Sequence, residues 1–411
     1  MATPKIRLKG FEGEWKVTRF SDIANIRRGL TFTPSDINND GIRVLRSSNI
    51  NEDWFQVSDD DIFVNENCVN IAYVNNNDIL ITAANGSPRL VGKHCLIKKA
   101  LDEKMVHGGF MLLATSQESP FVNASMSSRW FRDFQRVGIA GGNGAIGNLN
   151  KNILESYKFH IPETLGERES IATYFQSLDN LIQTTTKKIE SLKQMKAASL
   201  ISMFPQEGET VPKVRFKGFE GEWKSKKLAE IASFSKGNGY SKNDLCNNGT
   251  PIILYGQMYT NYSIVIDNLD TYTTPRDGSV YSKGGEVIIP GSGETPEDIA
   301  VASTIKRSGV IIGGDLNILY FDSDKFDSAF MAISITHSKT HFELSKYAQG
   351  KTIVHLRNGD IANGSVEFPS IAEQSAIASY FNNLNAQISL QSQRLEKLKQ
   401  IKAECLNKMF V

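Results

Sequence analysis

The feature that most constrains this chain is a helix-forming segment that occurs twice. The first copy runs from Thr164 to Phe204 and the second from Ser370 to Phe410, and the two align without a gap at an offset of 206 positions. Aromatic, aliphatic and charged residues recur at matching positions along the whole length. Self-similarity of this extent indicates a tandem duplication, so we expect two related halves.

Within each copy, apolar residues recur at steps of four and three positions, which places them on one narrow stripe of a helix. The predicted seam consists of Ile171, Phe175, Leu178, Ile182, Ile189 and Leu192 in the first copy and Ile377, Phe381, Leu384, Ile388, Leu395 and Leu398 in the second. A stripe this narrow needs a partner helix. We expect the two copies to pair as an antiparallel coiled coil with pseudo-twofold symmetry; the alternative is an amphipathic helix that packs on its own domain.

Each predicted helix begins with a capping signal. A side-chain oxygen of Thr164 or Ser370 can accept a hydrogen bond from the first turn. Glu167 and Glu373 follow at the spacing from which a carboxylate can reach back to the cap, so both starts fit a capping box.

A second, shorter repeat stands at the start of each half. Residues 4–16 have the sequence PKIRLKGFEGEWK, and residues 212–224 have the sequence PKVRFKGFEGEWK. Its glycines allow tight turns, and its aromatic residues favour burial. We expect this turn to dock the start of each domain onto a long helix; a core turn without a docking role is the alternative.

Between these repeats, the sequence pattern of each half predicts an α+β domain of short strands and polar turns. The expected strands are Ile42–Leu45, Asp78–Thr82, Phe110–Ala114, Ile252–Tyr255, Glu286–Pro290 and Ile318–Phe321. The expected short helices are Phe20–Ile26, Leu228–Ala232, Ser127–Phe134 and Ser328–His337. The chain thus divides into a first α+β domain (1–162), a first helical spacer (163–208), a second α+β domain (209–368) and a second helical spacer (369–411).

Composition limits the classes of function. The net charge of +1 means that any nucleic-acid surface must be local. The four cysteines show no CxxC spacing, which argues against a disulfide framework or a cysteine zinc site. The first residues lack an apolar signal region and no run of 18 apolar residues occurs, so we expect a cytoplasmic protein without a membrane span.

Motifs of catalysis are missing or poorly placed. Gly142–Gly147 fits GxGxxG, but it lies late in the domain and has no counterpart in the second half, so a dinucleotide site is not expected. His337 and His341 have the spacing of a helical metal pair but lack a third ligand. No P-loop, GxSxG or HExxH motif occurs. We therefore predict a binding protein without its own metal or cofactor.

The loops of the two halves differ, and they carry side chains that bind nucleic acid. Arginine can bind guanine, asparagine adenine, and lysine or serine phosphate oxygens. The first-half candidates are Arg43, Arg46, Ser47, Ser48, Asn49, Asn85, Ser87, Arg89, Lys93, Asn143, Asn148 and Lys151. The second-half candidates are Tyr255, Gln257, Tyr259, Ser292, Thr295, Lys351, Thr352, His355 and Arg357. Each is also a common surface residue, and drift in unconstrained loops is the alternative explanation.

Over its whole length the chain resembles the specificity subunit of type I restriction-modification systems. The resemblance is carried by both GFEGEW turns, by Asp78–Thr82 and Glu286–Pro290, by Gly144–Leu149 and Gly350–Leu356, and by the Pro-x-x-x-Glu-x-x-x-Ile-Ala-x-Tyr-Phe helix openings at Pro162 and Pro369, the first stretched by one residue. No single element is specific, but the combination is.

The resemblance implies two target recognition domains, each reading half of a bipartite asymmetric DNA site, with the helices as a ruler. It also implies that two methyltransferase subunits dock on the helices and turns, with restriction subunits outside them. Catalysis, S-adenosylmethionine, ATP and magnesium would belong to those partners. Two alternatives stay open: a duplicated enzyme with active sites in its cleft loops, and a coiled-coil adaptor that does not bind nucleic acid.

Overall fold

Segments from both ends of the sequence meet in one of the two units into which the chain divides. Unit 1 comprises Met1–Thr186 and Arg394–Val411, and unit 2 comprises Lys187–Gln393. The computed structural model describes residues 2–98, 103–140, 147–350 and 352–411. Both unit boundaries fall inside a long helix, so each unit contains the first part of one long helix and the last part of the other.

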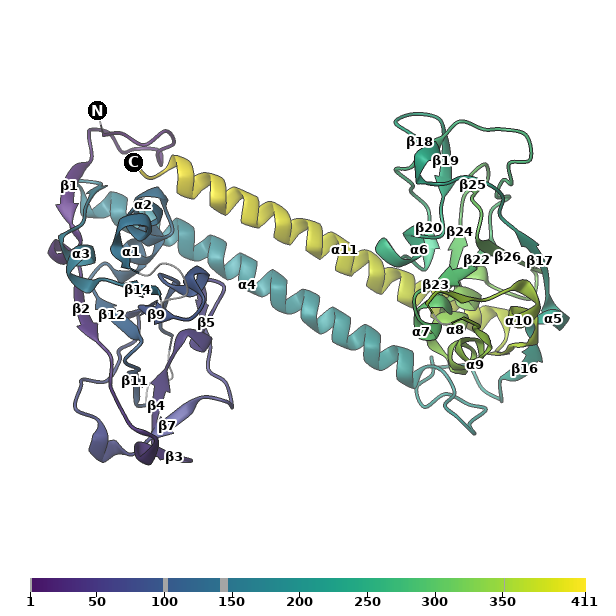
Figure 1. The fold of residues 1–411 in the computed structure, drawn as a ribbon, viewed down its shortest axis with the longest axis horizontal. Helices are drawn as coiled ribbons and strands as arrows, with labels where there is room; N and C mark the ends of the chain where they lie inside the picture. The colour runs from purple at the N-terminus through teal and green to yellow at the C-terminus, as the bar shows by residue number, and fades with distance from the viewer. Residues whose placement is uncertain (1, 99–102, 141–146, 351) are drawn as a thin grey trace. The chain divides into compact units, whose positions relative to one another are not determined.

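Unit 1 is built on two four-stranded sheets (Figure 1). The first has the order β10 (His94–Leu96), β8 (Ile79–Thr82), β12 (Met111–Thr115), β2 (Asn25–Arg28). The second has the order β11 (Met105–His107), β4 (Ile42–Leu45), β7 (Ile62–Val64), β3 (Ile37–Asn38). All four residues of β8 are buried, which explains why this strand is a continuous apolar run rather than an alternating one.

Smaller elements complete unit 1. The paired strands are β1 (Lys16–Arg19) with β15 (Lys158–Ile161), β5 (Ile50–Asn51) with β6 (Trp54–Phe55), and β14 (Gly147–Leu149) with both β13 (Ile139–Ala140) and β9 (Ala84–Asn85). The short helices are α1 (Ser119–Met126), α2 (Arg129–Gly138) and α3 (Lys151–Ser156).

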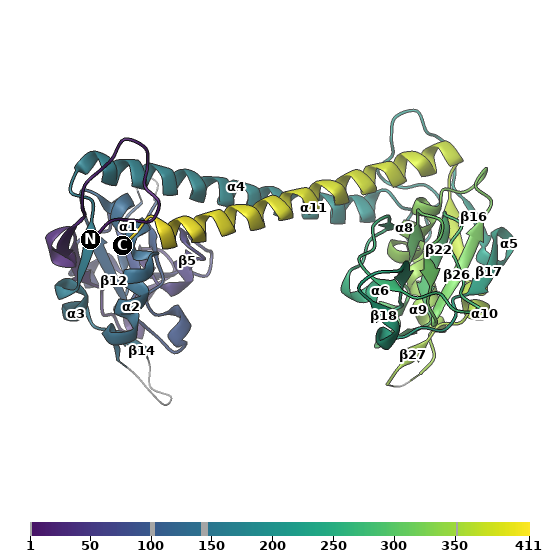
Figure 2. The same cartoon turned by 90° about the horizontal axis from the view of Figure 1, so that it is seen from above.

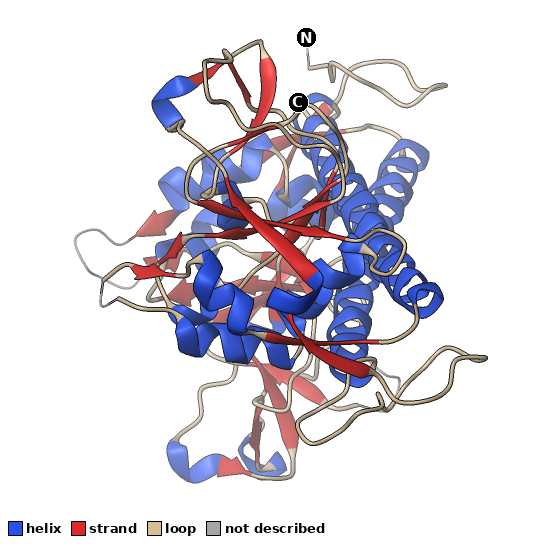
Figure 3. Cartoon of the chain, turned by 90° about the vertical axis from the view of Figure 1, so that its right-hand side faces the viewer, coloured by secondary structure: helices blue, strands red, loops and turns tan. Residues whose placement is uncertain are grey.

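Unit 2 repeats this plan, but one of its sheets has five strands. Its helices and strands are nearest the viewer in Figure 3. The five strands are β17 (Ala232–Lys236), β26 (Leu316–Phe321), β22 (Glu286–Pro290), β24 (Ser303–Ile305) and β20 (Val265–Ile266), in that order. A second sheet has the order β18 (Leu245–Cys246), β21 (Tyr272–Thr273), β19 (Thr250–Ile253), β25 (Ile311–Ile312). The remaining pairs are β16 (Lys224–Lys227) with β28 (Ser365–Phe368) and β23 (Ser292–Gly293) with β27 (Val354–His355). The short helices are α5 (Leu228–Ile231), α6 (Gln257–Thr260), α7 (Pro296–Ile299), α8 (Ser328–His337), α9 (Lys339–Tyr347) and α10 (Asn358–Asn363).

The long helices are α4 (Leu165–Ser202) and α11 (Ile371–Lys408), and within each unit they lie side by side (Figures 1 and 2). In unit 1, Tyr174 contacts Cys405 at 3.3 Å and Asp179 contacts Lys402 at 2.7 Å. The partner number falls as the first number rises, so the helices are antiparallel, as the seam predicted. Unit 2 contains the equivalent pair, with the Ser199 hydroxyl 2.9 Å from that of Tyr380.

The seam residues pack as predicted, although they also serve another purpose. Those on α4 and the first three on α11 are buried, and the last three on α11 are half-buried. Ile171, Phe175 and Leu178 also belong to the core of unit 1, together with Leu406 and Phe410 from the end of the chain. The first turns of α4 therefore pack on their own domain, as the alternative proposed, and also against the end of the second repeat.

The repeated turn docks onto both helices, as expected. In unit 1 the Ile6 amide donates to the Lys408 carbonyl at 2.9 Å, and the Trp15 ring meets the Phe410 ring edge-on at 6.0 Å. In unit 2 the Val214 amide donates to the Ser202 carbonyl at 2.9 Å. The turn therefore ties the start of each domain to the end of the helix from the other repeat.

The capping-box prediction is half wrong. The Glu167 amide does donate to the Thr164 hydroxyl at 3.4 Å. The Glu167 carboxylate, however, accepts two hydrogen bonds at 2.8 Å from the guanidinium of Arg7. Arg215 donates to Glu373 in the same way, at 2.6 and 2.7 Å. Both carboxylates are almost fully buried, and a bidentate arginine satisfies a buried carboxylate better than one cap amide does.

Two short helices also differ from expectation. Only Phe20–Asp22 form a turn of 3-10 helix, and the chain then enters β2, because Asn25 to Arg28 complete a sheet edge beside β12. The helix expected at Ser127–Phe134 is α2, which begins two residues later and ends four residues later, and the preceding helix α1 was not predicted. The expected strands are present, with ends shifted by at most two residues.

Candidate nucleic-acid interface

The ends of several strands of unit 1 meet around a cleft of about 740 Å³. Residues after β2, β4 and β9 line it, together with the turn between β11 and β12. The lining residues are Leu30, Thr31, Phe32, Arg46, Ser47, Ser48, Ile62, Ala84, Asn85, Gly86, Gly108, Gly109, Phe110 and Met111. Four predicted DNA-binding residues thus come together here, namely Arg46, Ser47, Ser48 and Asn85.

Two backbone segments cross beside this cleft, and their close approach requires glycine. A Cβ at Gly29 would lie 2.0 Å from the Gly108 carbonyl oxygen, so no other residue fits where these two backbones cross. Unit 2 has the same crossing, because a Cβ at Gly237 would lie 1.9 Å from the Gly313 oxygen. The crossing belongs to the shared scaffold, and the side chains around it are what differ.

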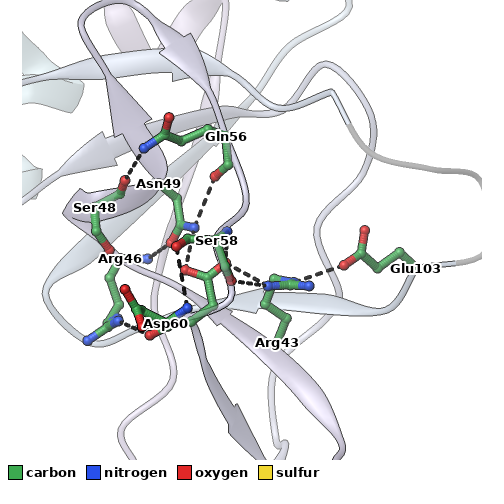
Figure 4. A network of polar contacts seen from close by, with 9 residues as sticks. Arg43, Arg46, Ser48, Asn49, Gln56, Ser58, Asp60 and Glu103 are labelled. Atoms are coloured by element: carbon green, nitrogen blue, oxygen red, sulfur yellow. Dashed lines mark hydrogen bonds and ion pairs between the residues drawn. The ribbon is translucent and has the colours of Figure 1, made fainter. Parts of the chain in front are cut away.

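Two predicted DNA-binding residues instead hold the loop beside the cleft (Figure 4). Asn49 is fully buried; its amide donates to Asp61 at 2.8 Å, and its oxygen accepts from the Arg46 amide at 2.7 Å. Arg43 donates to Asp61 at 2.7 Å and to Glu103 at 2.9 Å. Both polar groups have partners within the protein, because a buried charge or amide needs internal partners.

The other first-half candidates that the structure describes are not among the residues that line the cleft. Ser87, Arg89 and Asn148 are exposed, and Lys93 is half-buried. Lys151 pairs with Glu155 on α3 at 3.0 Å, so its charge is partly satisfied. Asn143 and most of the glycine motif at 142–147 lie outside the described residues.

Unit 2 places its candidates at the equivalent strand pair. Ser292 on β23 and His355 on β27 are cross-strand neighbours, with the serine oxygen 2.9 Å from the histidine Nδ1. The Tyr259 hydroxyl donates to the Ser292 carbonyl at 2.7 Å, and burial raises the pKa of that hydroxyl. In unit 1 the corresponding strands β9 and β14 pair Ala84 with Asn148. One backbone arrangement therefore presents different side chains.

The remaining second-half candidates are more scattered. Gln257 is satisfied internally, because its side chain binds the Leu254 amide and Thr271. Thr295 caps α7 through the Asp298 amide. Tyr255, Thr352, His355 and Arg357 are exposed. Lys351 lies outside the described residues.

Sequence reasoning missed the most exposed aromatic residue at the cleft. Phe110 is 70% exposed, although the strand residues that follow it from Met111 are buried. It was predicted to start a strand, and an aromatic residue in an apolar run is ordinarily buried. The preceding pair Gly108-Gly109 was the available signal, because it marks a turn at this point.

A metal centre is not assembled in the described part of the chain. No group of three or more histidine, cysteine or acidic residues that could hold a metal ion occurs there. His337 ends α8 and His341 lies on α9, where it contacts the Ala300 carbonyl, so the predicted spacing does not place the two on one helix.

Among the described helices, none is long and apolar enough to cross a membrane.

Comparison with known proteins agrees with the duplication. The model of the type I restriction modification DNA specificity domain matches residues 12–194 and again 220–400. The chain belongs to this family. Each match begins inside the repeated turn and ends in a long helix, so the family domain comprises the same parts as each repeat.

Two known proteins are similar to this chain. The type I restriction enzyme MjaVIII specificity subunit of Methanocaldococcus jannaschii is 23% identical over 274 residues, which are 64% of this chain and 63% of that relative. The match therefore spans less than two thirds of the relative's length. The crystal structure of the type I restriction-modification S subunit from M. genitalium has a TM-score of 0.62 at 13% identity, over 100% of this chain and 99% of that one. The second likeness establishes the fold.

Proposed function

We propose that this chain is the DNA-recognition subunit of a type I restriction-modification complex. Unit 1 reads one half of a bipartite asymmetric site and unit 2 reads the other. The observation that carries the proposal is the contrast between a repeated scaffold and unlike strand ends. Two DNA sequences require two different sets of base-contacting side chains on equivalent positions.

The surfaces that recur in both units suit a partner that binds twice. The repeated turns expose the same acidic residues, Glu12 and Glu14 in unit 1 and Glu220 and Glu222 in unit 2. An apolar residue is also exposed at each helix start, Leu165 at 49% and Ile371 at 37%. We infer that two copies of a modification subunit dock there, and that restriction subunits join outside them.

Chemistry in this proposal belongs to the partners. S-adenosylmethionine would bind the modification subunits, and ATP and magnesium would serve the restriction subunits. This chain contributes sequence choice, with phosphate contacts shared among the subunits. The complex would act on DNA in the cytoplasm.

Reconstitution tests the proposal. The purified chain with S-adenosylmethionine should methylate no DNA, whereas the chain with its modification subunit should methylate a single bipartite sequence. Binding of duplex DNA by that complex should weaken steeply as salt rises. Methylation by the chain alone would favour a duplicated enzyme, and a complex that binds no DNA would favour an adaptor.

The spacing role of the helices has a separate test. Removing seven residues from α4 and the matching seven from α11 keeps the seam in phase, since the stripe repeats every seven positions. If the helices set the distance between half-sites, the reconstituted complex should then require a different spacer length. An unchanged spacer in methylated DNA would contradict the ruler and leave the two-reader proposal standing.

A further inference from the structure

The place in unit 2 that corresponds to this cleft is lined by different side chains. Strand register aligns Met111, paired with Thr82, to Leu316, paired with Pro290, so Asp315 takes the position of Phe110. A Cβ at Gly293 would lie 3.1 Å from the Tyr259 hydroxyl, which shows how closely this tyrosine covers β23. Unit 1 therefore has an aromatic side chain at this position, and unit 2 has an acidic one.

The lining of the open cleft selects a class of ligand. Its polar side chains are Thr31, Arg46, Ser47, Ser48 and Asn85, and its walls include Leu30, Phe32 and Phe110. None of the described lining residues is acidic, so a cationic ligand finds no counter-charge. A volume of about 740 Å³ lies in the range of small-ligand pockets. Donors beside aromatic walls suit a flat molecule with acceptor atoms on its edge.

Phe110 is exposed and yet fixed in place. Its carbonyl oxygen accepts hydrogen bonds from the Ala83 amide at 2.9 Å and the Ala84 amide at 3.0 Å. These two bonds hold the turn against β9 while the ring is 70% exposed. A fixed, exposed aromatic ring is a suitable stacking surface for a nucleobase.

Arg46 supplies donors beside this surface. One guanidinium nitrogen donates to the Asp60 carbonyl at 3.1 Å, which positions the side chain (Figure 4). Its Nε is buried and has no hydrogen-bond partner in the described part of the chain. Because Nε is buried, the donors that a ligand in the cleft can meet are the terminal nitrogens of the guanidinium. Arginine binds the O6 and N7 acceptors of guanine in particular.

We propose that this cleft receives one specified nucleobase of the first half-site, with Phe110 against the base and Arg46 donating to its acceptor edge. The inference deepens the proposed function and rests on it. It assigns base discrimination at one position to two residues of unit 1. In unit 2 Asp315 takes the position of Phe110, so that unit must read its half-site with other side chains.

The experiment uses the chain reconstituted with its modification subunit and a DNA library in which each specified base of both half-sites is randomised in turn. Phe110→Ala and Arg46→Lys should lower the preference for one and the same base at least tenfold, in one half-site only. Val137→Ala is the matched control, because Val137 is 65% exposed on α2 of the same unit, away from the cleft. The control should keep every preference.

Three results would overturn the inference: preferences unchanged in both variants, changes in both half-sites, or a uniform loss of methylation without a change of preference. Uniform loss would mean a structural or phosphate-binding role. The exposed Phe110 can be replaced without opening the core, so that variant stays informative if Arg46→Lys fails to fold. Failure of the unmodified complex to methylate any bipartite site would contradict the proposed function itself, which is a distinguishable outcome.

Discussion

In unit 1 the guanidinium of Arg7 binds the buried carboxylate of Glu167, and in unit 2 Arg215 binds Glu373 with the same two-pronged geometry. A few strands away the two units share little: Phe110 stands at an open cleft in one, and Asp315 holds its place in the other. The contacts that join each domain to the helices are therefore duplicated, and the strand ends that carry the candidate DNA contacts have diverged.

This difference shows which parts of the molecule are free to change. The strand ends can accept new side chains because folding depends on the Arg–Glu pair, the glycine crossing and the aromatic cores. The same comparison makes each unit a control for the other. Matched substitutions in the two units test this comparison, beginning with those that should cost the most stability.

The aromatic end of each long helix stabilises the domain of the other repeat. Phe410 contacts Trp15, Phe121 and Phe175 in unit 1, and Phe204 contacts Trp223 and Phe330 in unit 2. Either Phe→Ala change should lower the stability of the unit that holds the ring by about 4 kcal/mol, because it leaves a cavity. Hydrogen exchange read by mass spectrometry should show Phe410→Ala loosening unit 1 and Phe204→Ala loosening unit 2. Faster hydrogen exchange in unit 1 after Phe204→Ala would contradict the claim that each helix end stabilises the domain of the other repeat.

Breaking the Arg–Glu pair should come next. Arg7→Leu leaves the Glu167 carboxylate buried without a cation, at a cost of about 3 kcal/mol. Arg215→Leu should cost unit 2 a similar amount. The measurement is the thermal or denaturant stability of each variant, with Arg7→Leu/Glu167→Leu as the control. The double variant should recover part of the loss; a double variant as unstable as Arg7→Leu would show that the unpaired carboxylate is not the cause of the loss.

Each unit contains a histidine with a lowered pKa, the buried His107 in unit 1 and the half-buried His337 in unit 2, which predicts a pH dependence. Burial lowers the pKa of His107 in unit 1 and of His337 in unit 2 to about 4. Because the unfolded chain binds these protons near pH 6.5, stability is complete above that pH and is lost as pH falls toward 4. Between pH 7 and 5 the loss should be about 2 kcal/mol for His107 and less for the half-buried His337. His107→Gln should flatten the pH profile of opening in unit 1 alone; an unchanged profile would contradict the assignment.

The smallest expected effect concerns two equivalent lysines. Lys402 pairs with Asp53 at 2.6 Å and Asp179 at 2.7 Å, whereas Lys196 has no ion pair in the described part of the chain. Burial lowers the pKa of Lys196. Lys402→Met should cost unit 1 about 1 kcal/mol, since both partners are partly exposed. Lys196→Met should leave unit 2 unchanged or slightly more stable. Equal losses in chemical denaturation would contradict this asymmetry.

The sequence predicted what depends on local period and repetition. The stripe through Ile171, Phe175 and Leu178 identified both long helices and their pairing, since a fixed period is visible without knowledge of distant contacts. Strands β4 and β22 were predicted at their observed bounds because buried strands form short apolar runs with clear ends.

What the sequence could not predict depends on distant contacts. Arg7 and Glu167 are 160 residues apart, so the carboxylate was assigned to a local cap. Asn49 lies in a loop whose composition suggests DNA binding. Only the folded structure shows that its side-chain amide donates hydrogen bonds to Asp61 and to the Gln56 carbonyl. Phe110 was hidden for the opposite reason, because its apolar neighbours suggested a buried strand.

The most direct test of the two-reader account is an exchange of one domain. Residues 20–150 would be replaced by the matching segment of another family member, and methylated bases would be mapped across the genome of a host that also carries the modification subunit. The account predicts that one half of the bipartite site changes while the other half stays the same. A change in both halves, or in neither, would contradict it.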